Sequence, residues 1–534
     1  MTSRTPAQRR GMVLIVVVVV VVMISLAGLS FVATMSMENK AARAQGDGLQ
    51  LEHLAGSGAE YLAAFVEQSF SEQQEAGGAW DNPGRFRGVV AFEDEERGRR
   101  AQFSVVAPRI ENGEARGIRF GVEDESARLN LAVLLQWESR QPGAAHEALM
   151  SLPGMTDAIA DAILDWIDPD SDPRPAGAEA DDYQALGVPY APRNGVPQCL
   201  EELLLVRGVT RDLLFGADAN FNHQVEPAEQ RAAAGRLEGT GLAPALPWAS
   251  LLTVSSAERN QSADGRPRIE LNQDDLAVLH RHLLEALEPR WADFIVLYRQ
   301  YGPAEGPGLP GDEEPPGKAG KEEAITVNPS TPAKFRIESI LDLVDARVEV
   351  PVPGQEEPRI VAGPFRSDPA QIHEYLPRLL DRTSVVGGPV IFGRVNVNLA
   401  PREVLRAVPG IDAATVDQIL AARASRPSPE DPDRRHAAWL LTEGVLSLGR
   451  MKDLMPYLTG GGDVVRAQVV AMFDPPGPSL RVETVVDATA SPARQVYWKD
   501  LRLLGRGYPP ESLGAEFSAP QVRGLRSIGG RVPF

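Results

Sequence analysis

Residues 12–33 read MVLIVVVVVVVMISLAGLSFVA, an apolar run without a single charged side chain. A helix needs about 20 such residues to cross the hydrocarbon core of a bilayer. Arg4, Arg9 and Arg10 precede the run and no acidic residue does. The positive-inside rule therefore keeps the N-terminus in the cytoplasm and sends the bulk of the chain across the membrane. The mean hydropathy of the whole chain, −0.19, indicates that the remainder is water-soluble.

Three interpretations of this N-terminus compete. A secretory signal has a shorter apolar core of about 7–15 residues and a small-x-small cleavage site, which Ala27, Gly28 and Ser30 match poorly. A plain membrane anchor fits the run equally well. In the third, the basic leader ending in Arg9-Arg10-Gly11 directly before Met12 resembles a type IV prepilin signal. Cleavage after Gly11 would then leave the apolar helix in the mature protein, with Met12 as its first residue.

The helix is expected to continue to about residue 68. Apolar residues fall three or four apart beyond the span, and no proline occurs between residues 12 and 82. Gly46, Gly48, Gly56 and Gly58 weaken this prediction, because glycine is a poor helix former. The pattern predicts one long helix, half in the membrane and half amphipathic.

Strand-like runs occur in two sets that lie far apart in the chain, at 87–92, 101–106 and 117–122, and at 464–473, 480–486 and 494–504. The segment between the two sets is rich in helical patterns. We therefore predict the α+β class, with an antiparallel-sheet domain split by a large α-helical insertion.

The middle of the chain contains internal repeats. Residues 149–167 and 405–424 share a Leu-x-x-x-Pro-Gly pattern between two helical segments, and 203–215 is a looser copy. These are helix–hairpin–helix units, which can bind DNA phosphates. Residues 147–167 carry four acidic side chains and no Lys or Arg, and the whole chain has a net charge of −19. Because phosphate binding depends on cationic groups, we interpret the units as packing modules and expect no nucleic acid.

Signatures of catalysis are missing from the sequence. Cys199 is the single cysteine, which excludes an intramolecular disulfide and a cysteine-cluster metal site. The string Gly306-x-Gly308-x-x-Gly311 matches a dinucleotide motif, but it lies in the Pro/Gly-rich loop 301–322 without a strand before it. The chain is therefore expected not to be an enzyme, and no catalytic residue is assigned.

Two acidic segments are candidate calcium sites. In the first, closely spaced carboxylates of a Pro-rich loop could supply the oxygens that Ca²⁺ prefers, although a solvated acidic loop has the same composition. The candidate ligands there are Asp168, Asp170, Asp172, Glu179 and Asp182. The second segment, 218–229, resembles a twelve-residue EF-type loop, except that His223 replaces the usual glycine. Its candidate ligands are Asp218, Asn220, Asn222, Gln224, Glu226 and Glu229.

Several segments, in order, resemble the family of the type II secretion minor pseudopilin protein K (general secretion pathway protein K). They are the Gly11/Met12 leader with its span, DESARLNLAVLL (124–135), AILDWIDPDSDPRPAGAEADDY (162–183), LEELLLVRGVT (200–210), GRVNVNLAPREVLRAVPG (393–410) and the closing strands. Residues 217–390 are longer than the family pattern. The resemblance implies a pilin-like sheet with an inserted, calcium-binding helical domain.

The resemblance also implies a function: a minor pseudopilin at the tip of the pseudopilus, which helps to initiate assembly and contacts substrates during export. Major pilin-like subunits carry a Glu at the fifth mature residue, where this chain would have Val16. The implied partners are other minor and major pseudopilins, the inner-membrane secretion platform, the prepilin peptidase and secreted proteins. The implied location is the bacterial inner membrane, crossed once, with a cytoplasmic N-terminus and a periplasmic body.

Two other functions compete with this one. A membrane-anchored DNA-binding or uptake protein would use the helix–hairpin–helix units, and a signal-anchored periplasmic enzyme would need a catalytic site. The expected domains are a leader (1–11), a transmembrane helix (12–33), the first part of the pilin-like domain (69–125), the first helical part (126–216), an atypical insertion (217–390), the second helical part (391–458), the closing strands (459–508) and a tail (509–534).

Overall fold

The computed structural model describes residues 10–94, 99–111, 114–185, 187–237, 246–304, 327–351, 358–424, 430–474 and 477–514. Residues 1–9 of the expected leader lie outside this part of the chain. The same holds for most of the expected loop 301–322 and for most of the expected tail 509–534.

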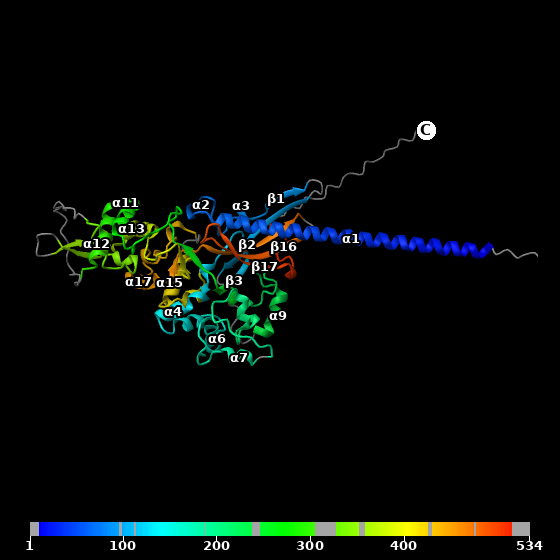
Figure 1. The fold of residues 1–534 in the computed structure, drawn as a ribbon, viewed down its shortest axis with the longest axis horizontal. Coiled ribbons are helices and arrows are strands. Elements are labelled where there is room, and N and C mark those ends of the chain that lie inside the picture. Colours follow the sequence, from blue (N-terminus) through cyan, green and yellow to red (C-terminus); the bar gives the residue numbers. More distant parts are fainter. Residues whose placement is uncertain are drawn as a thin grey trace, which may run out of the picture.

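A single helix, α1 (Arg10–Val66), forms the N-terminal part of the structure and extends far beyond the rest of the molecule (Figure 1). The predicted continuous helix is therefore observed, and its glycines do not interrupt it. In the described chain α1 is the one helix long and apolar enough to cross a membrane. Its apolar residues from Val13 to Met37 are exposed, whereas Leu51, Leu54 and Leu62 near its other end are buried.

An antiparallel sheet of seven strands receives this second half of α1. Its central order is β1-β2-β15-β16-β17, while β3 pairs with β2 and β4 with β15. The strands are β1 (Val89–Asp94), β2 (Arg99–Glu111), β3 (Glu114–Arg119), β4 (Glu123–Asp124), β15 (Val464–Phe473), β16 (Ser479–Asp487) and β17 (Arg494–Asp500). The α+β class is confirmed, with small shifts: β3 begins before the predicted 117–122, and β17 ends at Asp500 rather than at 504.

The contact between α1 and the sheet requires glycine at one position. A Cβ atom on Gly58 would lie 2.6 Å from Val469 Cγ1 and 3.0 Å from Phe103 Cδ2. Both of these side chains are buried in the core between α1 and the sheet. No heavy atom lies within 4 Å of the equivalent Cβ position on Gly56. Gly58 therefore permits the close approach of helix and sheet, while Gly56 has no such role.

The helical body between the two sets of strands contains mostly short helices. The α-helices are α4 (Leu134–Arg140), α5 (Ala144–Met150), α6 (Asp157–Ile167), α7 (Ala180–Gln184), α8 (Arg211–Phe215), α9 (Pro227–Leu237), α10 (Trp248–Leu251), α11 (Leu276–Ala286), α12 (Pro289–Tyr301), α13 (Pro369–Arg382), α14 (Arg402–Ala407), α15 (Ala413–Ala424), α16 (Trp439–Thr442) and α17 (Leu448–Leu454). Two more, α2 (Phe70–Glu75) and α3 (Pro83–Phe86), connect α1 to β1.

Three two-residue parallel ladders organise this body. The pairs are β5 (Leu129–Asn130) with β6 (Leu252–Thr253), β8 (Ile269–Glu270) with β11 (Thr383–Ser384), and β13 (Val395–Asn396) with β14 (Leu458–Thr459). The first strand of each pair lies in one of three similar segments, RLNLAVLL (128–135), RIELNQDDLAVL (268–279) and RVNVNLAPREVL (394–405), in which a short strand containing Asn precedes a helix. The body therefore contains three copies of one unit, each opened and closed by its own ladder.

The middle copy has its own stem. Strand β7 (Ala257–Arg259), just before this copy, pairs antiparallel with β12 (Val390–Phe392), just after it. The chain thus enters the middle copy at residue 260 and leaves it at residue 389, and these two points lie side by side. The stem lies inside the predicted insertion 217–390, whose boundaries stay a prediction, and β6 pairs with β5 of the first copy just before the stem begins.

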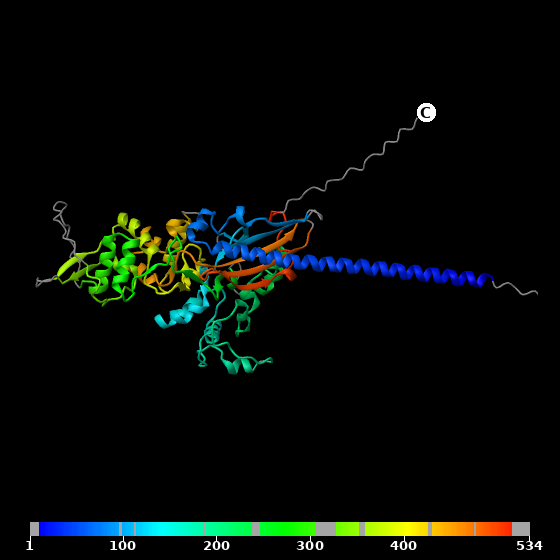
Figure 2. The ribbon, with the colours of Figure 1, turned by 45° about the horizontal axis from the view of Figure 1, so that its top comes forward.

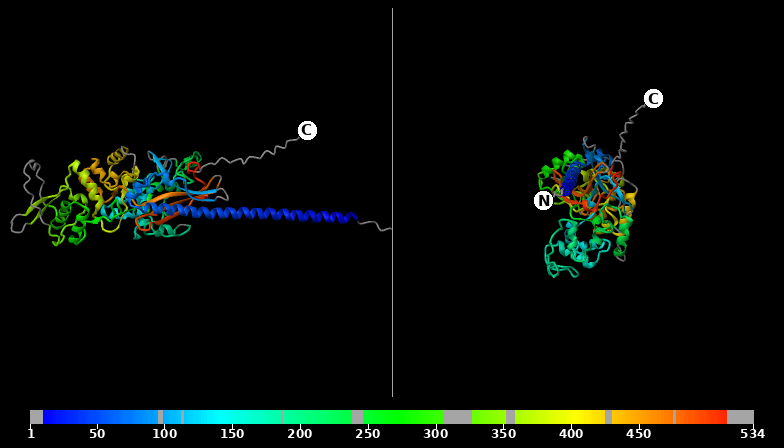
Figure 3. Two further views of the ribbon diagram at one scale, coloured as in Figure 1. Left: turned by 90° about the horizontal axis from the view of Figure 1, so that it is seen from above. Right: turned by 90° about the vertical axis from the view of Figure 1, so that its right-hand side faces the viewer.

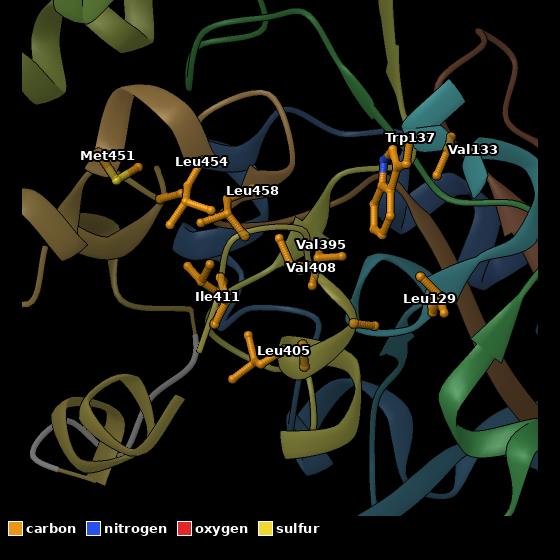
Figure 4. Close-up of a cluster of buried hydrophobic side chains, with 14 of the residues drawn as sticks. Leu129, Val133, Trp137, Val395, Leu405, Val408, Ile411, Met451, Leu454 and Leu458 are labelled. Atoms are coloured by element: carbon orange, nitrogen blue, oxygen red, sulfur yellow. The ribbon is translucent and has the colours of Figure 1, made fainter. Parts of the chain in front are cut away.

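The copies share a hydrophobic core. Figure 4 shows Leu129 and Trp137 of the first copy near Val395, Leu405 and Leu458 of the third. The middle copy, with α11, α12 and α13, lies at the end of the molecule opposite the free end of α1 (Figures 1 and 2). The segment with α6 and α7 forms a lobe to the side of the sheet. The view along the axis of α1 shows this lobe projecting from the rest of the molecule (Figure 3). We call this the lateral lobe.

Buried ion pairs join the sheet to the body. Glu125, which has no exposed surface, accepts hydrogen bonds from Arg466 Nε and Arg128 Nη1, both at 2.7 Å. Burial raises the pKa of Glu125, but the charges of Arg466 and Arg128 outweigh it, and the net pKa is lowered. Glu125 is therefore charged in the folded protein, and its two arginines are needed to keep it so.

Candidate cation site in the lateral lobe

Helix α6 positions the acidic residues of the lateral lobe. Thr156 caps its first turn, and all its residues from Ile159 to Ile167 are buried. Asp161, Asp165 and Asp168 follow each other at spacings of four and three, so they share one face of the helix and its end. The Trp166 ring packs edge to face on Tyr183 of α7, with centroids 5.4 Å apart. This contact holds α7 against α6 and keeps the connecting segment 169–179 close to the acidic face.

Two buried carboxylates bind one guanidinium, and a third buried carboxylate, Glu179, lies close enough to interact with both. Asp165 has no exposed surface, and Asp168 and Glu179 are each 5% exposed. Arg174 Nη1 donates to Asp165 Oδ1 at 2.7 Å and also to Asp168 Oδ2. The Arg174 backbone N–H lies 3.3 Å from each oxygen of Asp165.

Other carboxylate oxygens of this group have no partner. Asp168 Oδ1 and both oxygens of Glu179 are buried and accept no hydrogen bond within the described part of the chain. Burial raises the pKa of Glu179, and the nearby charges of Asp165 and Asp168 raise it further. Burial also raises the pKa of Asp168, although Arg174 opposes that rise. Unpartnered buried carboxylates are costly, so this group needs more positive charge than Arg174 provides.

A glycine makes room for the carboxylates. A Cβ atom on Gly177 would lie 1.8 Å from Asp165 Oδ2. The Ala176 backbone N–H donates to Asp161 Oδ2 at 3.0 Å, which ties this segment to α6. The backbone of 174–177 therefore forms a close-fitting wall around Asp165.

The structure separates the predicted ligands of the first segment. Asp168 and Glu179 lie together, but Asp170 and Asp172 are exposed, and Asp170 Oδ1 accepts from the Asp172 backbone N–H at 3.0 Å. Asp182 accepts from the Glu179 backbone N–H at 3.1 Å and pairs with Arg207 at 3.0 Å. Arg207 Nη2 also holds the Ala176 carbonyl at 2.7 Å.

Sequence reasoning missed Asp161 and Asp165, which complete the acidic group. Their spacing along α6 with Asp168 was the available signal, because residues at i, i+4 and i+7 share a helix face. Within the residues that the structure describes, no three His, Cys, Asp or Glu side chains stand close enough to hold a metal ion in their present positions. Asp165 and Asp168 are paired with Arg174 instead.

The second predicted segment forms a loop closed by its own hydrogen bonds. Asp218 accepts from the backbone N–H groups of Asn222 and His223, and Glu229 accepts from those of Ala219, Asn220 and Glu226. The amide groups of Asn220 and Asn222 donate to Glu226 at 2.9 and 2.7 Å. Asn222 Oδ1 accepts from the Gln224 backbone N–H at 2.9 Å. The carboxylates of this loop already have donors, and among its candidate ligands Asn220 Oδ1 is a buried oxygen without a partner in the described structure. This loop therefore has less need of a cation than the first segment, where carboxylate oxygens lack donors.

This loop packs against the sheet. Arg481, which is 1% exposed, donates to the carbonyls of Asn220 and, at 2.7 Å, Phe221. Gln468 Nε2 also donates to the Phe221 carbonyl at 2.8 Å. Phe221 and His223 adopt positive φ angles of 57° and 60°. The loop is thus a structural connection between the lateral lobe and strands β15 and β16.

The N-terminal candidates lie on α1. Gly11 and Met12 are within the helix, and Val16 is 57% exposed. The helix–hairpin–helix segments contain the helix pairs α5–α6 and α14–α15, and their assignment to that motif class stays a prediction.

Comparisons with known proteins find a matching protein family for one segment of the chain. Residues 127–215, which include α5 to α8 and the acidic group, match the family model described as type II secretion system (T2SS), protein K. No curated protein matches the chain.

One similar solved structure is described as the GspK-GspI-GspJ complex from the enterotoxigenic Escherichia coli type 2 secretion system. The two chains are 11% identical, with a TM-score of 0.32, over 86% of this chain and 98% of the other. Residues 127–215 therefore match a domain of the type II secretion system protein K family.

Proposed function

We propose that this chain is a minor pseudopilin located at the tip of the type II secretion pseudopilus. The observation that carries the proposal is the construction of α1. Its apolar first part is exposed, and its second part packs on an antiparallel sheet. A bare apolar helix of this length suits first a bilayer and then contact with the helices of neighbouring subunits. Other minor and major pseudopilins are therefore the proposed partners of residues 13–50.

The tip position is supported by Val16. If cleavage follows Gly11, Val16 is the fifth mature residue, and it has no charge to neutralise a subunit packed above it. An unpaired carboxylate within the membrane costs a few kcal/mol, so it persists only where a partner compensates it. The uppermost subunit has no such partner.

The shape of the body supports the same position. The lateral lobe extends to the side of the sheet, and the middle copy extends beyond it, away from the free end of α1 (Figures 1 and 3). Lobes of this size would obstruct lateral packing in a shaft but not at an end. In this arrangement the body lies in the periplasm, where it helps to initiate assembly and contacts substrates, and the N-terminus meets the secretion platform and the prepilin peptidase.

Two experiments test the proposal. Labelled pseudopili should carry this chain at one end only and in few copies, whereas labelling along the whole shaft would refute the tip position. Crosslinking in cells from positions in 13–50 should capture other pilin-like subunits. Protein that still begins at residue 1 or 2 in the presence of a prepilin peptidase would refute cleavage after Gly11.

We also propose that the acidic group of the lateral lobe holds a structural Ca²⁺ ion. The chemistry of the residues suits a hard cation, because Asp165, Asp168 and Glu179 offer buried carboxylate oxygens, three of which lack a donor in the described structure; the side chains would have to move closer together to bind it. Thermal melting of the full chain in detergent, with Ca²⁺ and with chelator, tests this, since a ligand of the folded state raises the midpoint. Identical effects of Ca²⁺ on the wild type and an Asp168→Asn, Glu179→Gln double variant would refute it.

A further inference from the structure

We propose that the Arg174 guanidinium is a built-in counter-ion that occupies the cation position of the lateral lobe, so that Ca²⁺ binds only when Arg174 withdraws. This inference rests on the calcium proposal above and concerns how that site is regulated. It predicts that the lateral lobe folds without a bound cation. It also predicts that the presence of Arg174 lowers the affinity of the lobe for Ca²⁺.

The first observation is the position of Arg174 Nη1. This one nitrogen donates to Asp165 Oδ1 at 2.7 Å and to Asp168 Oδ2, so it lies between two buried carboxylates. A calcium ion shared by the same two oxygens would stand about 2.3–2.6 Å from each. Both cannot be present, because the nitrogen and the ion would occupy the same space.

The second observation is what Arg174 leaves unsatisfied. Asp168 Oδ1 and both oxygens of Glu179 have no donor among the described residues, although these side chains are 5% exposed. A guanidinium donates in one plane, from a fixed fork. A calcium ion gathers six to eight oxygens from all directions. Arg174 therefore supplies the charge for two carboxylates but cannot reach every oxygen that a cation would collect.

The charges lead to the same conclusion. Asp165, Asp168 and Glu179 carry three negative charges when ionised, and Arg174 supplies one positive charge. A divalent cation in place of Arg174 leaves less uncompensated charge among these buried groups. Exchange of the guanidinium for Ca²⁺ therefore reduces the repulsion that Glu179 experiences from Asp165 and Asp168.

The position of Arg174 allows its side chain to move into solvent. Arg174 belongs to the segment 169–179 rather than to a helix, and its side chain is 26% exposed. A long arginine side chain can therefore move its head into solvent without a change in α6. The wall 176–177 stays in place meanwhile, because Asp161 and Arg207 hold its backbone.

Competition of this kind has a measurable size. If Arg174 occupies the position in nine molecules of ten, the apparent calcium affinity is about tenfold weaker than the intrinsic one. Removal of the guanidinium should therefore raise the apparent calcium affinity about tenfold, to the intrinsic value. It should also leave the cation-free lobe with uncompensated buried carboxylates, so the same substitution should lower stability without calcium.

The test uses full-length protein in detergent and Ca²⁺ alone as the probe, with calorimetric titration and thermal unfolding. Arg174→Ala should bind Ca²⁺ about tenfold more tightly than the wild type, melt at a lower temperature in chelator, and gain more from Ca²⁺. Arg174→Gln keeps most of the side-chain volume and should behave in the same way if the alanine variant does not fold. The control is Arg193→Ala, which removes a guanidinium paired with Glu202 in the same lobe and should match the wild type in calcium affinity.

The outcomes separate the two proposals. Equal or weaker calcium binding by both Arg174 variants, with clear binding by the wild type, would overturn the counter-ion role and leave the calcium site intact. Absence of binding by the wild type and by both variants would refute the calcium site, and the counter-ion inference with it.

Discussion

Gly58→Ala should loosen α1 from the sheet, whereas Gly56→Ala should tighten it. Both substitutions remove a poor helix former and should each gain about 1 kcal/mol of helix stability. At Gly58 the new methyl group would lie 2.6 Å from Val469 Cγ1 and 3.0 Å from the Phe103 ring. Overpacking of a well-packed core costs about 1–3 kcal/mol. The Gly58 variant should therefore be the less stable of the two by about 1–3 kcal/mol.

Hydrogen–deuterium exchange of residues 51–66 in the full-length protein measures this difference, because it reports local opening of a helix. A difference of about 1–3 kcal/mol corresponds to exchange roughly 5- to 150-fold faster in the Gly58 variant than in the Gly56 variant. The Gly56 variant is the matched control, since it lies on the same helix with no atom near its Cβ position. Equal protection in the two variants would refute the close contact between α1 and the sheet.

Three further predictions follow from other parts of the molecule. Glu125→Gln should lower the free energy of unfolding, measured by denaturant titration, by about 3–5 kcal/mol, because Arg466 and Arg128 lose a buried charged partner. The control Glu52→Gln, which breaks an exposed ion pair, should change the free energy of unfolding by less than about 1 kcal/mol. Burial, together with nearby arginines, lowers the pKa of His436 well below its usual value, so the folded state excludes a proton that the unfolded state binds below about pH 6.5. The free energy of unfolding should therefore fall as the pH drops below that value, by up to about 1.4 kcal/mol per pH unit. Denaturant midpoints of the His436→Gln variant should fall less steeply with pH than those of the wild type, because the variant lacks this contribution. If the chain occupies the proposed tip position, Val16→Glu should reduce crosslinking to neighbouring pilin-like subunits, because its carboxylate would have no partner there. Crosslinking equal to that of Val16→Ala would contradict this.

Large elements of the fold could be predicted from the sequence. The apolar run 12–33 and the absence of proline predicted α1, and β-rich runs predicted the strands of the sheet. The β7–β12 stem could not be predicted, because strands of three residues carry little local signal and pair across a long stretch of chain. The start of the middle copy at 260 depends on this pairing.

The acidic site was predicted only in part. The spacing of Asp168, Asp170 and Asp172 suggested a shared cation, but the structure turns Asp170 and Asp172 outward and brings Asp165 and Glu179 to Asp168. Arg174 had no place in that prediction, because its role depends on how the segment 169–179 folds back on α6. The EF-like spacing of 218–229 matched a ligand pattern, yet backbone amides of the loop take up the carboxylates of Asp218 and Glu229.

The β7–β12 stem has a consequence for how this chain can vary in length. Entry and exit of the middle copy are hydrogen-bonded neighbours, so they stand only about 5 Å apart. A segment inserted between such neighbours leaves the strands on either side undisturbed, and doubling its length adds only about 0.6 kcal/mol of closure entropy. A two-residue hairpin turn could close the same pair of strands. This stem is therefore a point at which the helical body can gain or lose a whole unit while α1 and its sheet keep their geometry.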